Sequence, residues 1–253
     1  MISFMSKHIL TSCLLLVAII TGCTAKKATE QQHLNKENYF IPGLKHGLIQ
    51  SPINILSAEI EDLNGHEITL NFQDKINAVE NLGHTVQLDF AQGSTVSSDG
   101  KLYQLKQLHF HTPSEHLIDG MTFPMEMHIV NQVPSVNKED TPHYLVVAVL
   151  FKMGKKNKFI SEFLDQVPKE ENSKTELQAD KVKLSDVVSD FLSTTPSFYH
   201  YQGSLTTAPY TESVSWFVLK RIIEASPEQI RAINKIEGDN ARHIQGKYGR
   251  QID

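Results

Sequence analysis

Residues 107–111 read Gln-Leu-His-Phe-His, and residues 126–130 read Glu-Met-His-Ile-Val. Both stretches alternate polar and apolar side chains, which is typical of a half-buried β-strand. Because successive side chains of a strand point to opposite faces, the two histidines of the first stretch leave the same face. In the second stretch, His128 shares a face with the glutamate two residues before it. If the two strands pair antiparallel, three imidazoles can converge on one point.

Three converging imidazoles favour a metal site. Catalytic Zn²⁺ takes three neutral nitrogens and keeps one coordination position open, whereas structural zinc takes a fourth protein ligand. The only cysteines are Cys13 and Cys23, both near the N-terminus, so no cysteine is available to complete a structural site. The alternative is that a His-x-His pair on a strand is an accident of surface or core packing, with no metal.

The composition excludes several classes of protein. Of the 253 residues, 40% are hydrophobic and 21% are charged, close to the average for soluble globular proteins. A disordered chain, a collagen-like repeat and a polytopic membrane protein need other compositions. The net charge of −5 has the wrong sign for a protein that binds the phosphate backbone of nucleic acids. We therefore expect one globular domain that does not bind nucleic acid.

Short strands dominate the pattern after residue 40. The stretch at 144–151 is continuously apolar, as expected for a central strand covered on both faces. Alternating stretches predict further strands at 68–72, 86–90 and 102–110.

Three helices are expected. Ser226-Pro227-Glu228-Gln229 offers an N-cap serine, a proline at the first helical position and a glutamine three residues after the serine, and Gly238 marks the end of the helix. Shorter helices are predicted at 159–166 and 184–192. The chain therefore reads as a single domain, mainly β with a few short helices.

The first 22 residues are typical of an export signal. Lys7 precedes an apolar run at 9–20, which is too short to span a bilayer of about 30 Å but fits a secretory signal. Ile20-Thr21-Gly22-Cys23 resembles the lipobox of bacterial lipoproteins, in which the cysteine receives the lipid. We predict a lipid anchor at Cys23 on a periplasmic or cell-surface protein. A simple cleaved signal is the alternative.

The predicted organisation is a signal at 1–22, a polar flexible tether at 23–38 and a folded domain at 39–253. The lipid would be the only contact with a membrane. The sequence carries no signal for an oligomeric state.

The chain resembles the α-class carbonic anhydrases at five separated places. The longest match is His-Phe-His-Thr-Pro-Ser-Glu-His at 109–116 followed by Glu-Met-His at 126–128, which is similar to the zinc motif of that family. The other matches, in the family's order, are Gln50–Ile55, Asn81–Gln87, Gly203–Pro209 with Glu212, Val214 and Trp216 after it, and Asn240–Arg242 with Gln245 and Arg250–Ile252.

The resemblance implies a fold and a reaction. The fold is a single domain around a large, twisted, mostly antiparallel central sheet. The cofactor is Zn²⁺ on His109, His111 and His128. The reaction is the reversible hydration of carbon dioxide to bicarbonate and a proton, with zinc-bound hydroxide as the nucleophile. The partners are thus small molecules, carbon dioxide and bicarbonate.

The resemblance also implies roles for residues around the metal. Gln107 and Glu126 would hydrogen-bond the ring nitrogens of the first and third ligands that face away from the zinc. Glu115 would accept a hydrogen bond from the Thr206 hydroxyl and so orient the nucleophile. Without the other motifs, Glu115 and Thr206 would be interpreted as a helix cap or a loop hydrogen bond. His116 interrupts the strand pattern and is interpreted as structural.

His84 is the expected proton shuttle, because an imidazole changes its charge near neutral pH. Taken alone, a histidine after a glycine is more often an exposed loop residue. Carbon dioxide would rest on an apolar wall whose members would otherwise be interpreted as core: Val130, Val146, Leu205, Val214 and Trp216. The resemblance also implies that Thr207 binds the substrate.

The sequence departs from the family at two places. The aromatic N-terminal segment of the family is not recognisable before Gln50. Many bacterial members carry one cysteine before the early motif and another after the threonine pair, where this chain has Tyr210. Because both cysteines are missing together, we expect a different means of anchoring the N-terminal segment.

Two other functions fit parts of the pattern. A non-catalytic binding or adhesion lipoprotein could use the same fold, as in relatives that lost a zinc histidine. A lipoprotein that captures zinc would need accessible extra ligands or a histidine-rich tract, whereas the 12 histidines here are dispersed along the chain.

The lipobox predicts the effect of one substitution. Cys23→Ser should abolish labelling with a radioactive fatty acid and release the protein from the membrane fraction, because the serine cannot take the lipid. Cys13→Ser, inside the discarded apolar run, is the matched control and should label normally. Unchanged labelling of Cys23→Ser would contradict the predicted anchor.

Overall fold

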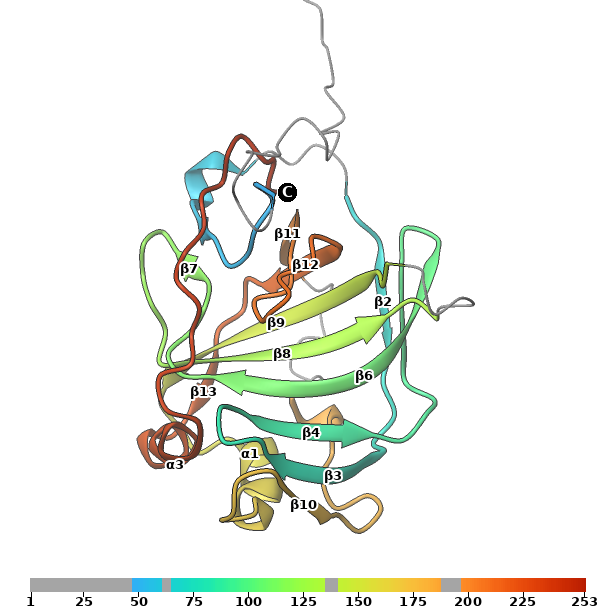
Figure 1. Cartoon of the computed structure of the whole chain (residues 1–253), viewed down its shortest axis with the longest axis vertical. Coiled ribbons are helices and arrows are strands. Elements are labelled where there is room, and N and C mark those ends of the chain that lie inside the picture. The colour runs from blue at the N-terminus through green and yellow to red at the C-terminus, as the bar shows by residue number, and fades with distance from the viewer. Residues whose placement is uncertain (1–46, 61–64, 135–140, 188–196) are drawn as a thin grey trace, which may run out of the picture. The chain divides into compact units, whose positions relative to one another are not determined.

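The computed structural model describes residues 47–60, 65–134, 141–187 and 197–253 (Figure 1). All of these residues fall within one compact unit, Lys36–Asp253. The expected signal at 1–22, Cys23 and the expected tether at 23–38 lie outside the described residues. Among the described residues, no helix is long and apolar enough to cross a membrane.

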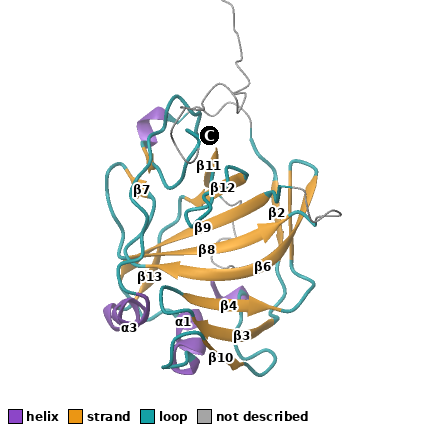
Figure 2. Cartoon of the chain, viewed as in Figure 1, coloured by secondary structure: helices purple, strands orange, loops and turns teal. Residues whose placement is uncertain are grey.

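Strands are the main regular structure of the described chain, and the helices are short (Figure 2). The main path of an 11-stranded sheet runs in the order β10 (Ser173–Glu176), β3 (Ile76–Asn81), β4 (Val86–Phe90), β6 (Lys101–His111), β8 (Met125–Gln132), β9 (Tyr144–Met153), β12 (Val214–Leu219) and β11 (Phe198–Gly203). Three more strands join it at the side: β5 (Thr95–Ser98) pairs with β6, β2 (Ile68–Asn71) pairs with β5, and β13 (Ile223–Ala225) pairs with β9.

The smaller elements complete the described fold. A two-stranded sheet joins β1 (Asn54–Ile55) to β7 (Leu117–Ile118). The helices are α1 (Lys158–Phe163) and α3 (Pro227–Glu237), with 3₁₀ turns η2 (Ser57–Glu59) and η3 (Leu164–Gln166).

The predicted mainly β, mostly antiparallel fold is confirmed. The parallel pairs are β9 with β12, β9 with β13, and β1 with β7. All the strands expected from alternation are present within a few residues of their predicted bounds, and the helix expected at 159–166 is α1 followed by η3. The helix expected at 184–192 lies partly outside the described residues.

Strands β8 and β9 lie in the middle of the sheet (Figure 1). Nearly all of their residues are buried, so both faces are covered. Side chains of one face, such as Ile129 and Val147, belong to a large apolar cluster with α1 and α3. Side chains of the other face, such as Val130 and Val146, belong to a smaller cluster with Trp216. This smaller cluster lies on the face that carries His128, because His128 lies two residues before Val130 along β8 and alternate residues of a strand share a face.

Helix α3 begins with the predicted capping box. The Ser226 hydroxyl accepts a hydrogen bond from the backbone N–H of Gln229, and the Gln229 side chain accepts one from the N–H of Ser226. At the other end, Glu237 accepts hydrogen bonds from the Thr112 hydroxyl at 3.0 Å and the Val86 N–H at 3.2 Å. The helix therefore anchors the segment that follows the histidine strand β6.

Glu212 holds the N-terminal end of the described chain where the resemblance expects a disulfide. Its carboxylate accepts hydrogen bonds from the Ile49 N–H at 3.1 Å and the Gln50 amide at 2.8 Å. The Gln50 amide also donates to the Tyr210 carbonyl at 3.2 Å, and Arg242 donates to the Gln50 side-chain oxygen at 2.9 Å. This hydrogen-bonded contact joins the same two segments that a disulfide would join.

Candidate active site

The pairing of β6 with β8 brings three histidines together. The two strands are antiparallel, and His109 lies directly opposite His128. The ring centroids are 4.9 Å apart for His109 and His111, 5.2 Å for His109 and His128, and 4.6 Å for His111 and His128. One ring nitrogen from each side chain lies within 4.8 Å of the other two. The structure thus has the convergence that strand alternation predicts.

Hydrogen bonds fix the orientation of two of these rings. His109 Nδ1 lies 2.9 Å from the Gln107 side-chain oxygen, and His128 Nε2 lies 2.7 Å from Glu126 Oε1. The other nitrogen of each ring remains available toward the shared centre. Such hydrogen bonds behind a metal ligand set the tautomer of the ring and raise its basicity.

His111 provides the test of whether this site fits a metal. Its side chain is buried, and neither of its ring nitrogens has a hydrogen-bond partner among the described residues. A buried polar atom without a partner costs about 1–3 kcal/mol. A metal ion at the shared centre would be a partner for one of the two His111 nitrogens, so the three histidines fit a bound metal.

Burial keeps the three imidazoles neutral. Removal from water lowers the pKa of His111 to about 4, and it also lowers the pKa values of His109 and His128. The mutual repulsion of the three rings, if charged, lowers the pKa of His109 further. A neutral imidazole has the lone pair that a metal ion needs.

Glu126 is the buried anion behind the histidines. Burial by itself would raise its pKa, but the electrostatic attraction of the His116 and His128 rings and the hydrogen bonds from both rings outweigh it and hold the pKa well below its usual range. The carboxylate also accepts the backbone N–H groups of Glu115 and His116, each at 2.8 Å. His116 Nδ1 lies 2.6 Å from Glu126, and its Nε2 lies 2.7 Å from the Tyr201 hydroxyl. His116 therefore positions Glu126.

Glu115 lies on the other side of the histidines, near Thr206. Its Oε1 accepts the Arg242 N–H at 2.9 Å, and its Oε2 lies 3.6 Å from His111 Nε2. Burial raises the pKa of Glu115, while the charge of His128, the Arg242 N–H and the Thr206 hydroxyl act in the opposite direction. The structure thus brings Glu115 and Thr206 to the same place beside the three clustered histidines.

A hollow of about 190 Å³ opens over His109 and His128. Its remaining lining consists of Gln107, Val130, Tyr144, Val146, Leu205, Thr206, Thr207 and Trp216. The residues expected to form the carbon dioxide wall thus line it, with the exception of Val214. Val214 is buried in the adjacent apolar cluster, opposite Tyr144 in the β12–β9 register. Sequence analysis missed Tyr144 because nothing in a continuously apolar strand marks the side chains that face a hollow.

The comparison with known families agrees with this geometry. The model of the eukaryotic-type carbonic anhydrase family matches residues 35–252. The chain belongs to the α-class carbonic anhydrase family. The membership predicted from the five motifs is confirmed.

Individual carbonic anhydrases are similar over most of their length. A carbonic anhydrase of Neisseria gonorrhoeae is 37% identical over 210 residues, which cover 81% of this chain and 77% of that protein. The solved α-carbonic anhydrase of Thermovibrio ammonificans, in complex with the inhibitor sulfanilamide, is 34% identical with a TM-score of 0.72 and covers 81% of this chain and 87% of that one. A dioscorin from Dioscorea japonica is also similar, 32% identical over 81% of this chain and 75% of that protein.

The expected shuttle His84 is exposed and does not line the hollow of this carbonic anhydrase. Its Nδ1 lies 2.9 Å from the Leu82 carbonyl, and its own carbonyl accepts a hydrogen bond from Asn240 at 2.8 Å. It lies three residues before Gln87, which pairs with His109 in the β4–β6 register. Its charge is among those that lower the pKa of His109. His84 is thus exposed to solvent two residues before strand β4, which pairs with the histidine strand β6.

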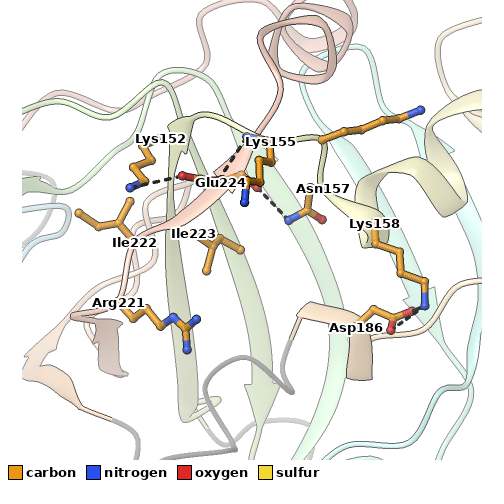
Figure 3. Close-up of a pocket in the computed structure, with 10 residues that line it drawn as sticks. Lys152, Lys155, Asn157, Lys158, Asp186, Arg221, Ile222, Ile223 and Glu224 are labelled. Carbon is orange, nitrogen blue, oxygen red and sulfur yellow. Dashed lines mark hydrogen bonds and ion pairs between the residues drawn. The ribbon is translucent and has the colours of Figure 1, made fainter.

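A larger hollow, of about 410 Å³, lies elsewhere and is lined by charged side chains (Figure 3). Lys152 pairs with Glu224 at 3.5 Å, and Lys158 pairs with Asp186 at 3.0 Å. None of the three clustered histidines lines it. Size alone therefore does not identify the active site of this carbonic anhydrase.

The Glu126 contacts predict the effect of one substitution on metal binding. Glu126→Gln replaces an anion that accepts four N–H groups by an amide of the same shape, so His128 loses its charged partner. We expect the affinity for Zn²⁺, used as the probe ion, to fall about 10- to 100-fold in chelator competition.

Glu176→Gln is the matched control, because Glu176 is an exposed carboxylate on β10. This variant should bind Zn²⁺ like the unmodified protein. A folded Glu126→Gln protein with undiminished affinity would show that Glu126 does not support the metal ligands.

Proposed function

We propose that this chain catalyses the reversible hydration of carbon dioxide to bicarbonate and a proton, with one Zn²⁺ held by His109, His111 and His128. The observation that carries the proposal is the set of three neutral imidazoles around one centre, His109 half-buried and His111 and His128 buried, of which His111 has no other partner among the described residues. Three nitrogen ligands with an open position suit a catalytic zinc. Membership of the carbonic anhydrase family supports the reaction.

Zn²⁺ would supply a bound water whose proton leaves near neutral pH, as well as a positive charge that polarises the substrate. Gln107 and Glu126 would hold the two outer ligand rings in their metal-binding tautomers. The Thr206 hydroxyl would donate its proton to a hydrogen bond with Glu115. The Thr206 oxygen could then only accept a hydrogen bond from the reacting water, which would orient that water. All of these residues would thus act by fixing which nitrogen or oxygen atom carries each proton.

The apolar side of the hollow would bind carbon dioxide. Val130, Val146, Leu205 and Trp216 present hydrocarbon surface beside the metal ligands. Carbon dioxide is small and has no hydrogen-bond donor, so such a wall binds it and excludes the water that would compete for the place. Thr207 would contribute a polar group at the border of this wall.

His84 would carry the proton from the site to the buffer. An exposed imidazole takes up and releases protons near neutral pH, and bridging water would connect it with the hollow. We further propose, from the N-terminal sequence pattern, that the enzyme is exported and lipid-anchored at Cys23.

The central test is the removal of one metal ligand. The purified protein should contain about one zinc per chain by elemental analysis and should hydrate carbon dioxide in a stopped-flow assay. His109→Ala should lose the zinc and at least about 100-fold of the hydration rate, because two ligands hold the ion poorly. His243→Ala, which removes an exposed histidine, should keep both the zinc and the hydration rate.

Two results would overturn this proposal. A protein stripped of metal that hydrates carbon dioxide at the full rate would exclude zinc catalysis. A folded protein that holds zinc but has no hydration activity would instead support the non-catalytic binding protein that shares this fold.

The shuttle predicts a dependence on buffer. His84→Ala should slow turnover by up to about 100-fold in dilute buffer, and concentrated imidazole should restore much of the rate, since an external base replaces the missing one. The initial rate at high buffer is the internal control. Equal rates in all buffers would show that His84 does not transfer the proton.

A further inference from the structure

A second cluster of possible metal ligands is formed by His66, His200 and Asp253. One ligand atom from each of these side chains lies within 4.8 Å of the others. His66 precedes β2, His200 lies on β11, and Asp253 follows the last described strand by many residues. The cluster therefore joins three distant segments of the chain.

This cluster faces away from the active-site hollow. In the β11–β12 register, Tyr201 pairs with Trp216 and His200 pairs with Phe217. Trp216 lines the hollow, whereas Phe217 belongs to the large apolar cluster of the other face. Because side chains alternate along a strand, His200 lies on the face opposite to Trp216.

We propose that His66, His200 and Asp253 form a second binding site for a divalent transition-metal cation of the zinc type, separate from the active site. The proposal concerns metal binding and does not rest on the catalytic function.

The spacing of the ligand atoms fits one ion. His66 Nε2 lies 3.1 Å from Asp253 Oδ2, and His200 Nδ1 lies 3.5 Å from the same oxygen. Ligands that bind zinc tetrahedrally at 2.0–2.1 Å lie roughly 3.3 Å apart. A small outward movement of the carboxylate would therefore admit the ion between the three atoms.

The remaining ring nitrogens are hydrogen-bonded in the way metal-binding histidines are. His66 Nδ1 lies 2.7 Å from Asp99 Oδ2, and His200 Nε2 lies 2.9 Å from the Ser215 hydroxyl. A carboxylate behind a ligand histidine orients the ring and raises its basicity. These contacts direct His66 Nε2 and His200 Nδ1 toward Asp253.

A separate observation also points to a bound ion: the His200 side chain is buried, and one of its ring nitrogens lacks a hydrogen-bond partner in the described chain. Its side chain is only 8% exposed, and its Nδ1 has no hydrogen-bond partner among the described residues. Burial lowers the pKa of His200 to about 4, so the ring is neutral and has a lone pair to offer. A buried nitrogen aimed at a carboxylate without a hydrogen bond is a position that a cation would satisfy.

The backbone holds Asp253 in place for this role. The His200 N–H donates to the Asp253 carbonyl at 3.0 Å, and the Asp253 N–H donates to the His200 carbonyl at 3.1 Å. The side chains of His66 and Asp253 are 26% and 22% exposed, which gives an ion access from solvent. A bound ion would thus link β2 and β11 to the segment at residue 253 and stabilise the folded state.

The test counts metal ions on the full chain. The enzyme is equilibrated with excess Zn²⁺, passed over a desalting column, and analysed for zinc per chain and for Tm. We expect about two zinc ions per chain and a Tm that rises by several degrees with added Zn²⁺. Asp253→Asn and His66→Gln, which keep the side-chain size, should reduce the content to one ion and abolish the rise in Tm.

His243→Ala is the control for adventitious binding to surface histidines and should keep the second ion. His109→Ala, which lacks the active-site ion, should still bind one ion and show the rise in Tm, so the result does not depend on the proposed catalysis. The inference is overturned if the unmodified enzyme takes up a single zinc, or if Asp253→Asn and His66→Gln retain two.

Discussion

The register between β6 and β8 is the constraint on which the candidate active site depends. Antiparallel pairing places His109 directly opposite His128, and alternation along β6 adds His111 on the same face. A slip of one residue would turn the histidines of one strand to the other face, where the large apolar cluster lies. Met127 and Ile129 oppose such a slip, because both are fully buried in that cluster. The packing of one face therefore secures the chemistry of the other.

Buried charge and hydrogen bonding connect this pair of strands to the rest of the molecule. Glu126 joins His128 to His116, and His116 reaches the hydroxyl of Tyr201 on β11. Tyr201 donates in turn to Ser51, near the N-terminal end of the described chain. Removing one member would leave a buried polar group without its partner, which is costly in an apolar interior. The clustered histidines are thus held by a network that extends well beyond them.

Two histidine clusters on opposite faces of one sheet follow the same physical rules. In each, two rings have one nitrogen hydrogen-bonded and the other directed to a shared centre. In each, burial also keeps a histidine neutral, as at His111 and His200. They differ in their surroundings. Trp216 and its neighbours provide an apolar hollow beside the first cluster, whereas Asp253 provides a negative charge to the second. The first arrangement suits a reaction and the second suits the retention of a cation.

The sequence by itself determined the structural features that depend on residues close together along the chain. Alternation was sufficient for strand 86–90 and for the shared face of His109 and His111, and the capping residues were sufficient for the helix that begins after Ser226. Short polar strands such as β10 gave no such signal, because their stability comes from pairing with β3 and not from their own pattern. Only the tertiary structure decided which distant side chains meet. His66 and Asp253 are 187 positions apart, and no local periodicity records a contact between segments that only the folded sheet brings together.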